Sequence, residues 1–188
     1  MFSKIKAKDL LRQPNTLTLV RILAIPIIVI LLLFPNRLFA FLGALVFSAA
    51  AITDYLDGYY ARRFGLVSNL GKIMDPLADK LLISSSLIML VSHGWAPAWI
   101  VCIIIGREIA VTGLRTIIAD SGEDMSASYL GKYKTGFQIA AIIPLLIHFE
   151  YVTINFSEIG HVMLWGALIF TIWSGIDYFV KFKKHLQF

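Results

Sequence analysis

Long apolar segments constrain the fold of this chain more than any other feature. Of its 188 residues, 58% are hydrophobic and 15% are charged, a composition unlike that of a water-soluble domain. A helix needs roughly 20 residues to cross the hydrocarbon of a bilayer. Six windows of about that length predict an all-α integral membrane protein with six transmembrane helices. They lie near residues 17–34, 38–57, 74–92, 95–118, 133–149 and 160–180.

The basic residues predict how these helices are oriented. Of the 17 Lys and Arg residues, all except Arg37 fall on one side of the six predicted spans. Because basic residues accumulate on the cytoplasmic side of a membrane, we expect both termini to be cytoplasmic. Segment 1–14 mixes lysines with apolar residues and predicts a short amphipathic helix on the membrane surface. Short connections and the absence of repeats favour a single domain over residues 1–188.

Four aspartates gather at the predicted cytoplasmic ends of the second and third helices. Asp54, Asp57, Asp75 and Asp79 fall within 26 residues. An ionisable group in a membrane costs roughly 3 kcal/mol to desolvate, so it normally faces a partner, a cavity or a metal. Helical spacing places the members of each pair about one turn apart. Because oxygen ligands select hard cations, the four carboxylates predict Mg²⁺ or Mn²⁺, and their mutual repulsion favours two ions.

Small residues accompany these aspartates. On a helix, Gly58 and Ala61 share a stripe of about 100° with the first two aspartates. Small side chains at these positions and at Gly71 leave room for a bulky ligand near the backbone, and Arg62 can meet its negative charge. The alternative is that Gly58 and Ala61 only allow close packing of membrane helices.

The complete spacing resembles the signature of the CDP-alcohol phosphotransferase family. That signature reads DxxDGxxAR, eight residues, then GxxxDxxxD, and residues 54–79 read DYLDGYYAR, RFGLVSNL and GKIMDPLAD without a departure. The resemblance implies a six-helix membrane fold, usually dimeric. It also implies an enzyme that moves a phosphatidyl group from a CDP-linked lipid to an alcohol and releases CMP.

The resemblance also implies roles for individual residues. Asp54, Asp57, Asp75 and Asp79 match the metal ligands. Asp79 matches the general base as well, and an Asp within reach of the acceptor hydroxyl can take its proton. The positions that match the CDP-lipid site of the family are Asp57, Gly58, Ala61, Arg62 and Gly71.

Three further segments look like parts of bacterial phosphatidylglycerophosphate synthases. They are PNTLTLVRILAIP at 14–26, GREIAVTGLR at 106–115 and SYLGKYKTGFQ at 128–138. Those enzymes use CDP-diacylglycerol as donor and sn-glycerol 3-phosphate as acceptor. The resemblance therefore implies these two substrates, in the bacterial inner membrane, with the active site facing the cytoplasm.

Four cations give an independent reason to expect a phosphorylated acceptor. Arg107 and Arg115 lie eight residues apart, near one helix face, and Lys132 and Lys134 begin the fifth helix on the same membrane side. Together they are suited to a second phosphate. The alternative for the two lysines is ordinary snorkelling to lipid headgroups, which explains Arg107 less well because it lies deeper in an apolar run.

Three other charged residues are of interest. Glu108 is expected to balance one of the neighbouring arginines, because an unpaired buried charge is costly. Arg21 either reaches the cavity that holds the acceptor phosphate or anchors the first helix at the cytoplasmic surface, and the sequence leaves both interpretations open. Asp177 is expected to pair with Lys181 at the i, i+4 separation.

Other functions fit the sequence less well. A secondary transporter also carries acidic residues in helices, but its sites lie near the midplane between inverted repeats, and no repeat is present here. Within the family, cardiolipin synthases and inositol-phosphate lipid synthases are rivals, and only the latter need a basic phosphate pocket. Nucleic acid is a poor partner because the basic residues line the predicted membrane edges.

Overall fold

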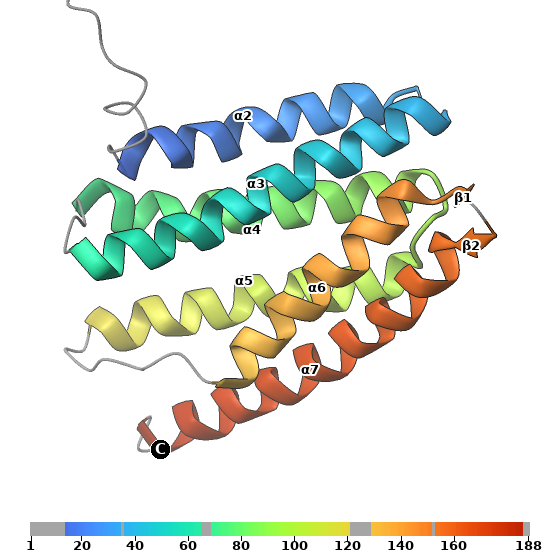
Figure 1. The fold of residues 1–188 in the computed structure, drawn as a ribbon. Coiled ribbons are helices and arrows are strands. Elements are labelled where there is room, and N and C mark those ends of the chain that lie inside the picture. Colours follow the sequence, from blue (N-terminus) through green and yellow to red (C-terminus); the bar gives the residue numbers. More distant parts are fainter. Residues whose placement is uncertain (1–13, 35, 65–68, 121–128, 152, 186–188) are drawn as a thin grey trace, which may run out of the picture. The chain divides into compact units, whose positions relative to one another are not determined.

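The computed structural model describes residues 14–34, 36–64, 69–120, 129–151 and 153–185. Within these ranges the chain forms six helices and one hairpin of two short strands (Figure 1). Each predicted window coincides with one helix, whereas the expected N-terminal amphipathic helix lies outside the described residues. The elements are α2 (Pro14–Leu32), α3 (Arg37–Phe64), α4 (Asn69–Ser92), α5 (Ala98–Asp120), α6 (Tyr129–Ile147), β1 (Glu150–Tyr151), β2 (Ile154–Asn155) and α7 (Phe156–His185).

The prediction of an all-α fold is confirmed, since the only strands among the described residues are the two-residue β1 and β2. By length and composition, one described helical segment is suited to cross a membrane, the 26 residues Phe156–Lys181 of α7. Segments Thr18–Leu32 and Arg37–Thr53 are apolar but shorter.

Local signals set several helix ends. The side-chain oxygen of Asn36 accepts a hydrogen bond from the Phe39 amide at 3.0 Å and caps α3. At the start of α7, Asn155 Oδ1 accepts a hydrogen bond from the Glu158 amide at 3.3 Å and so caps the helix. The Asn155 side-chain amide donates in return to the Glu158 carboxylate at 2.9 Å. After α4, Gly94 has a φ of +70°, and the bonds from Gly94 and Trp95 back to α4 form a Schellman motif.

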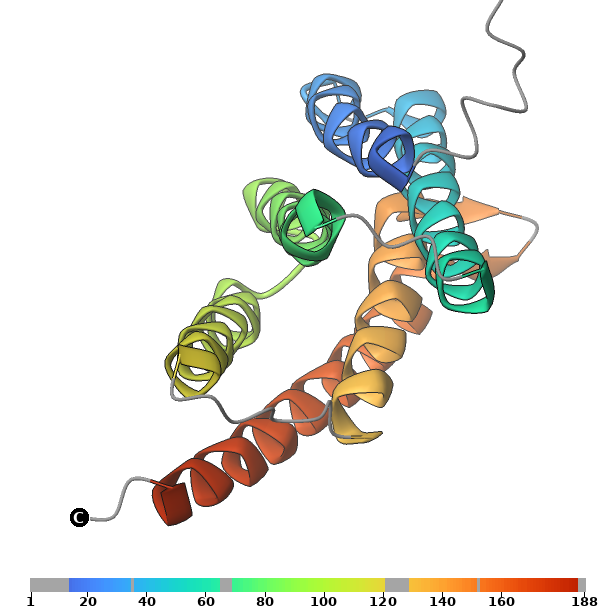
Figure 2. The same ribbon diagram turned by 90° about the vertical axis from the view of Figure 1, so that its left-hand side faces the viewer.

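The chain divides into two compact units, residues 1–89 and 90–188. In the first unit, α2 packs along α3 (Figures 1 and 2). Ala24, Ile28 and Leu32 recur every four residues on α2 and are buried. They belong to the same core as Ala44 and Phe47 of α3, which are also buried. The 3.6-residue period of a helix thus gives α2 one continuous packed face.

In the second unit, α6 and α5 both pack on α7 (Figure 2). Two glycines of α7 allow α6 to come close. A Cβ on Gly160 would lie 2.5 Å from Leu145 Cγ, and a Cβ on Gly166 would lie 2.7 Å from Phe137 Cδ1. Small residues at helix interfaces serve the same purpose in membrane proteins generally.

The outer faces of these helices are apolar as well. Leu19, Leu23 and Ile27 are exposed on α2, and Trp165 and Ile169 are exposed on α7, although the opposite faces of both helices are packed. A helix that is apolar on all sides is typical of a buried or lipid-facing position. The exposed apolar side chains explain why 58% of the residues can be hydrophobic although the buried core holds only part of them.

The motif-bearing helices are longer than predicted. The window 38–57 becomes a helix to Phe64, and the window 74–92 becomes a helix from Asn69. Charged turns lower the hydropathy without breaking the backbone hydrogen bonds of a helix. Pro76 lies inside α4, about two turns after Asn69, so the helix does not begin at this proline.

Candidate functional site

In the first unit, the two described aspartates of the motif share one arginine. Asp75 and Asp79 lie one turn apart on α4, where both side chains are partly exposed. The Arg21 guanidinium of α2 donates to Asp79 Oδ1 at 2.8 Å and to Asp75 Oδ1 at 3.2 Å. Thr18, one turn before Arg21, also donates its hydroxyl to Asp75 Oδ1. The two carboxylates therefore point to a common cationic group.

Arg21 is the buried member of this arrangement. Its side chain is 1% exposed, whereas those of Asp75 and Asp79 are 40% and 38% exposed. The reading of Arg21 as a plain surface anchor is therefore wrong. The sequence did contain a sign of this partner. Arg21 is the only charged residue of α2, and a charged side chain in an apolar helix normally has a partner of opposite charge.

The remaining motif residues lie on described helices, but their side chains lie outside the described part of the structure. The backbone of α3 is helical from Asp54 through Arg62, and Gly71 lies in the first turn of α4. The described side chains, which include Asp75 and Asp79 but not Asp54 and Asp57, contain no group of three or more metal-ligating residues.

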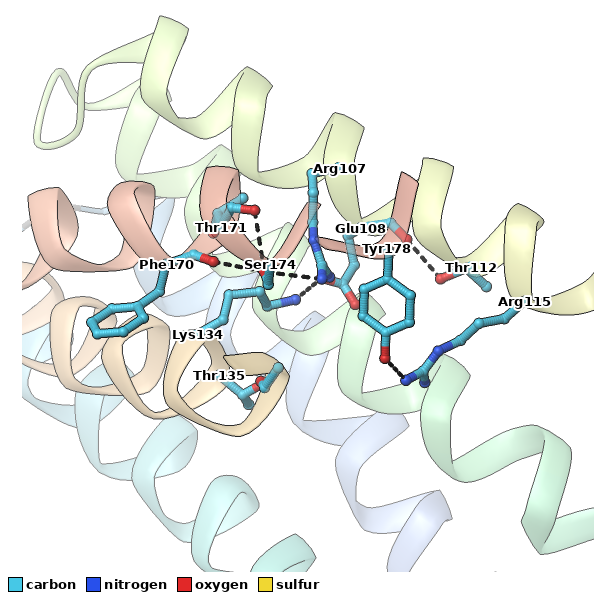
Figure 3. Close-up of polar contacts among 11 residues, drawn as sticks. Arg107, Glu108, Thr112, Arg115, Lys134, Thr135, Phe170, Thr171, Ser174 and Tyr178 are labelled. Atoms are coloured by element: carbon cyan, nitrogen blue, oxygen red, sulfur yellow. Dashed lines mark hydrogen bonds and ion pairs between the residues drawn. The ribbon is translucent and has the colours of Figure 1, made fainter. Parts of the chain in front are cut away.

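In the second unit, three of the predicted acceptor cations belong to one polar network (Figure 3). Arg107 and Arg115 come from α5 and Lys134 from α6. Lys134 pairs with Glu108, whose Oε2 also lies 3.6 Å from Arg107 Nη1. The expectation that Glu108 balances an arginine is confirmed, and a lysine shares the same carboxylate. Lys134 and Arg107 are 4% and 11% exposed.

Residues of α7 complete this network. Arg107 donates to the Ser174 hydroxyl at 3.0 Å, and Arg115 donates to the Tyr178 hydroxyl. The sequence did not single out Ser174 or Tyr178, because neither belongs to a charged pattern or to the motif. Each lies on the buried face of α7, and Ser174 and Tyr178 are four residues apart.

Lys132 has a different position from Lys134. It lines a shallow groove in the second unit together with Tyr133, Gly136, Phe137, Ala140 and Met163. Two residues of separation turn a helix by about 200°, so the two lysines lie on opposite faces of α6. The expected pair between Asp177 and Lys181 is confirmed at 2.7 Å.

The chain belongs to the CDP-alcohol phosphatidyltransferase family, which it matches over residues 11–173. The family predicted from the aspartate spacing is therefore confirmed. Relatives cover nearly the whole chain. One, from Bacillus subtilis (strain 168), is named CDP-diacylglycerol–glycerol-3-phosphate 3-phosphatidyltransferase and is 48% identical over 183 residues, covering 89% of this chain and 93% of the relative.

Two further relatives carry the same name. The one from Rickettsia felis is 40% identical over 173 residues, covering 92% of this chain and 96% of the relative. The one from Haemophilus influenzae is 37% identical over 179 residues, covering 92% of this chain and 94% of the relative.

Proposed function

We propose that this protein transfers the phosphatidyl group of CDP-diacylglycerol to sn-glycerol 3-phosphate, giving phosphatidylglycerol phosphate and CMP. One observation carries the proposal: relatives named for this reaction, one at 48% identity, align with nearly the whole chain. The intact motif from Asp54 to Asp79 and the basic network around Glu108 support it.

The donor set in the first unit fits a divalent cation. Asp75 and Asp79 already direct carboxylate oxygens to one cationic group, and their partial exposure leaves them accessible from solution. Oxygen-only ligands are suited to Mg²⁺ or Mn²⁺. We propose that Asp54, Asp57, Asp75 and Asp79 hold two such ions. When bound, the ions would neutralise the diphosphate of the donor and stabilise the departing CMP.

The other residues of the motif take the roles that the family implies. Asp79 accepts the proton of the acceptor hydroxyl as that hydroxyl attacks the lipid-linked phosphorus. Arg21 and Thr18 hold the Asp75 and Asp79 carboxylates in a fixed direction. The proposed contacts to the CDP-lipid are made by Asp57, Gly58, Ala61, Arg62 and Gly71.

The acceptor phosphate is proposed to bind the cations of the second unit. Arg107 and Lys134 both contact the Glu108 carboxylate, and Arg115 contacts Tyr178, whose ring also lies against Arg107. A phosphate monoester carries a charge of about −1.5 to −2 at neutral pH and prefers guanidinium partners. Lys132 belongs to the same proposed set through the sequence alone.

The setting of the enzyme is part of the proposal. We propose one domain over residues 1–188, six membrane spans, both termini and the active site at the cytoplasmic face, and the bacterial inner membrane as location. The distribution of Lys and Arg and the apolar outer faces of α2 and α7 support this topology. The homodimer is proposed from the family resemblance.

Product identification tests the proposal. The full chain in detergent receives CDP-diacylglycerol, Mg²⁺ and one acceptor at a time: glycerol 3-phosphate, inositol phosphate, phosphatidylglycerol or serine. We expect CMP and a chloroform-soluble phosphatidylglycerol phosphate with glycerol 3-phosphate alone. A preference for inositol phosphate or phosphatidylglycerol would reject this acceptor but keep the family. Transport without CMP release would reject the enzyme.

A further inference from the structure

One turn of α7 touches both arginines of the proposed acceptor site. Ser174 and Tyr178 lie on the side of α7 that faces α5 (Figure 3). Gly175 of the same turn also faces Arg107. The Ser174 hydroxyl accepts from Arg107 and donates to the Phe170 carbonyl at 2.6 Å, which fixes its direction. A Cβ on Gly175 would lie 3.3 Å from Arg107 Cγ, so the missing side chain makes room for the stem of this arginine.

Tyr178 is in contact with both guanidiniums. The ring centroid lies 5.5 Å from Arg107 Cζ and 4.9 Å from Arg115 Cζ, both within the range of a cation–π interaction. The hydroxyl of the same side chain accepts a hydrogen bond from Arg115. Tyr178 is only 3% exposed, so its ring is fixed by packing rather than free to follow the arginines.

An aromatic ring held in this way between two arginines has a clear physical use. Two guanidiniums near each other repel, and each long side chain loses rotamer entropy when it is ordered. A rigid aromatic ring that attracts both cations offsets part of the repulsion and orders both side chains before the ligand binds. Recognition of a phosphate by paired N–H donors depends on this kind of preorganised direction.

We infer that Tyr178 is a specificity-determining positioning residue, which holds Arg107 and Arg115 in the arrangement that selects a phosphate monoester as acceptor. Ser174 and Gly175 support it by fixing the position of Arg107 on α7. The inference rests on the proposed function, because that proposal assigns the two arginines to the acceptor phosphate.

Kinetics of the full chain test this role. Tyr178→Phe keeps the ring and removes the hydroxyl, and we expect the KM for glycerol 3-phosphate to rise about tenfold while the KM for CDP-diacylglycerol stays unchanged. Tyr178→Leu also removes the ring and should raise the acceptor KM further. Tyr151→Phe, in the hairpin, is the matched control. An unchanged acceptor KM, or an equal rise in both KM values, would overturn the inference.

A binding measurement separates this inference from the proposed function. Inorganic phosphate and glycerol 3-phosphate are titrated against the thermal midpoint of wild type and Tyr178→Phe, without donor lipid. The variant should need about tenfold more of either ligand for the same stabilisation. If wild type makes no lipid from glycerol 3-phosphate, the proposed function fails and this titration alone decides the inference. Equal titrations would overturn it.

A second variant covers the case in which the Tyr178 variants fail to fold. Ser174→Ala removes the hydrogen bond to Arg107 and leaves Tyr178 in place. We expect a rise of a few fold in the acceptor KM and no change in the KM for the donor. No selective effect on the acceptor would contradict a positioning role for this turn of α7.

Discussion

The two polar sites of the molecule have opposite charge patterns. In the first unit, one buried arginine lies between two half-exposed aspartates. In the second unit, the buried Lys134 and the partly buried Arg107 lie beside one glutamate, and Arg115 contacts Tyr178. The first arrangement leaves carboxylate oxygens for an added cation, and the second leaves N–H donors for an added anion. In each site a protein side chain already has the charge sign of the proposed ligand. Arg21 is positive like a metal ion, and Glu108 is negative like a phosphate.

The largest effect is expected at the reacting end of the acidic site. Asp79→Asn should lower kcat by about 10³-fold or more, because an amide cannot take the proton of the acceptor hydroxyl. Mg²⁺ binding should largely persist through the other carboxylates. Turnover assays and Mg²⁺ titration of the variant check this. Asp177→Asn is the control, and full activity of Asp79→Asn would remove the general-base role.

The next effect concerns the buried cation of the acidic site. Arg21→Ala removes the only described guanidinium that contacts Asp75 and Asp79. Because water can still reach both partly exposed carboxylates, the loss of this hydrogen-bonded charge should cost about 1.5–3 kcal/mol. The thermal midpoint should fall well below that of the control Arg37→Ala, where the arginine is exposed. Millimolar Mg²⁺ should restore part of the loss, since the ion supplies charge of the same sign. No loss of stability would mean that the aspartates do not depend on Arg21.

The basic site should respond through its substrate. Arg107→Ala should raise the KM for glycerol 3-phosphate about thirtyfold, because a charge-assisted hydrogen bond to phosphate is lost, and should affect the donor KM far less. Steady-state kinetics with each substrate varied in turn measure the two values. Lys181→Ala removes one exposed positive charge from the same unit and serves as control. Equal changes in both KM values would argue against an acceptor site here.

The smallest effect is expected at the anion within the basic site. Glu108→Gln keeps the shape of the side chain and takes the negative charge away from Lys134 and Arg107. The free energy of unfolding should fall by about 1–2 kcal/mol. Inorganic phosphate should recover more of this stability in the variant than in Glu150→Gln, an exposed control. Chemical denaturation with and without phosphate measures the free energy of unfolding of both variants. If phosphate does not stabilise Glu108→Gln more than the control, Glu108 is not part of a phosphate site.

The sequence predicted the helices better than the contacts between them. Hydrophobic windows identified all six described helices, because packing and lipid both require long apolar runs. The same windows missed the ends at Phe64 and Asn69, where charged residues continue the helix. The hairpin of β1 and β2 was not predicted, since strands of two residues show no alternation.

The same difference applies to the candidate site, where the local motif could be predicted and the contacts between helices could not. The aspartate motif could be recognised because its spacing is local. The contact of Arg21 with Asp75 joins positions 54 residues apart, and the contact of Arg115 with Tyr178 joins positions 63 apart. Such pairings depend on how whole helices pack, which helical periodicity in one segment does not specify. A charged residue in an apolar helix predicts that a partner exists but not which residue it is.

The pairing of Arg21 with α4 has a consequence for biogenesis. Arg21 is made on the ribosome more than 50 residues before Asp75, since the two are 54 positions apart. If α2 enters the bilayer as proposed, its lone guanidinium must wait near the headgroups, and a charge held there costs less than one at the bilayer centre. Once α4 is made, Asp75 and Asp79 can replace the headgroups as partners of Arg21, so a nascent chain halted before Asn69 would leave this guanidinium without either carboxylate.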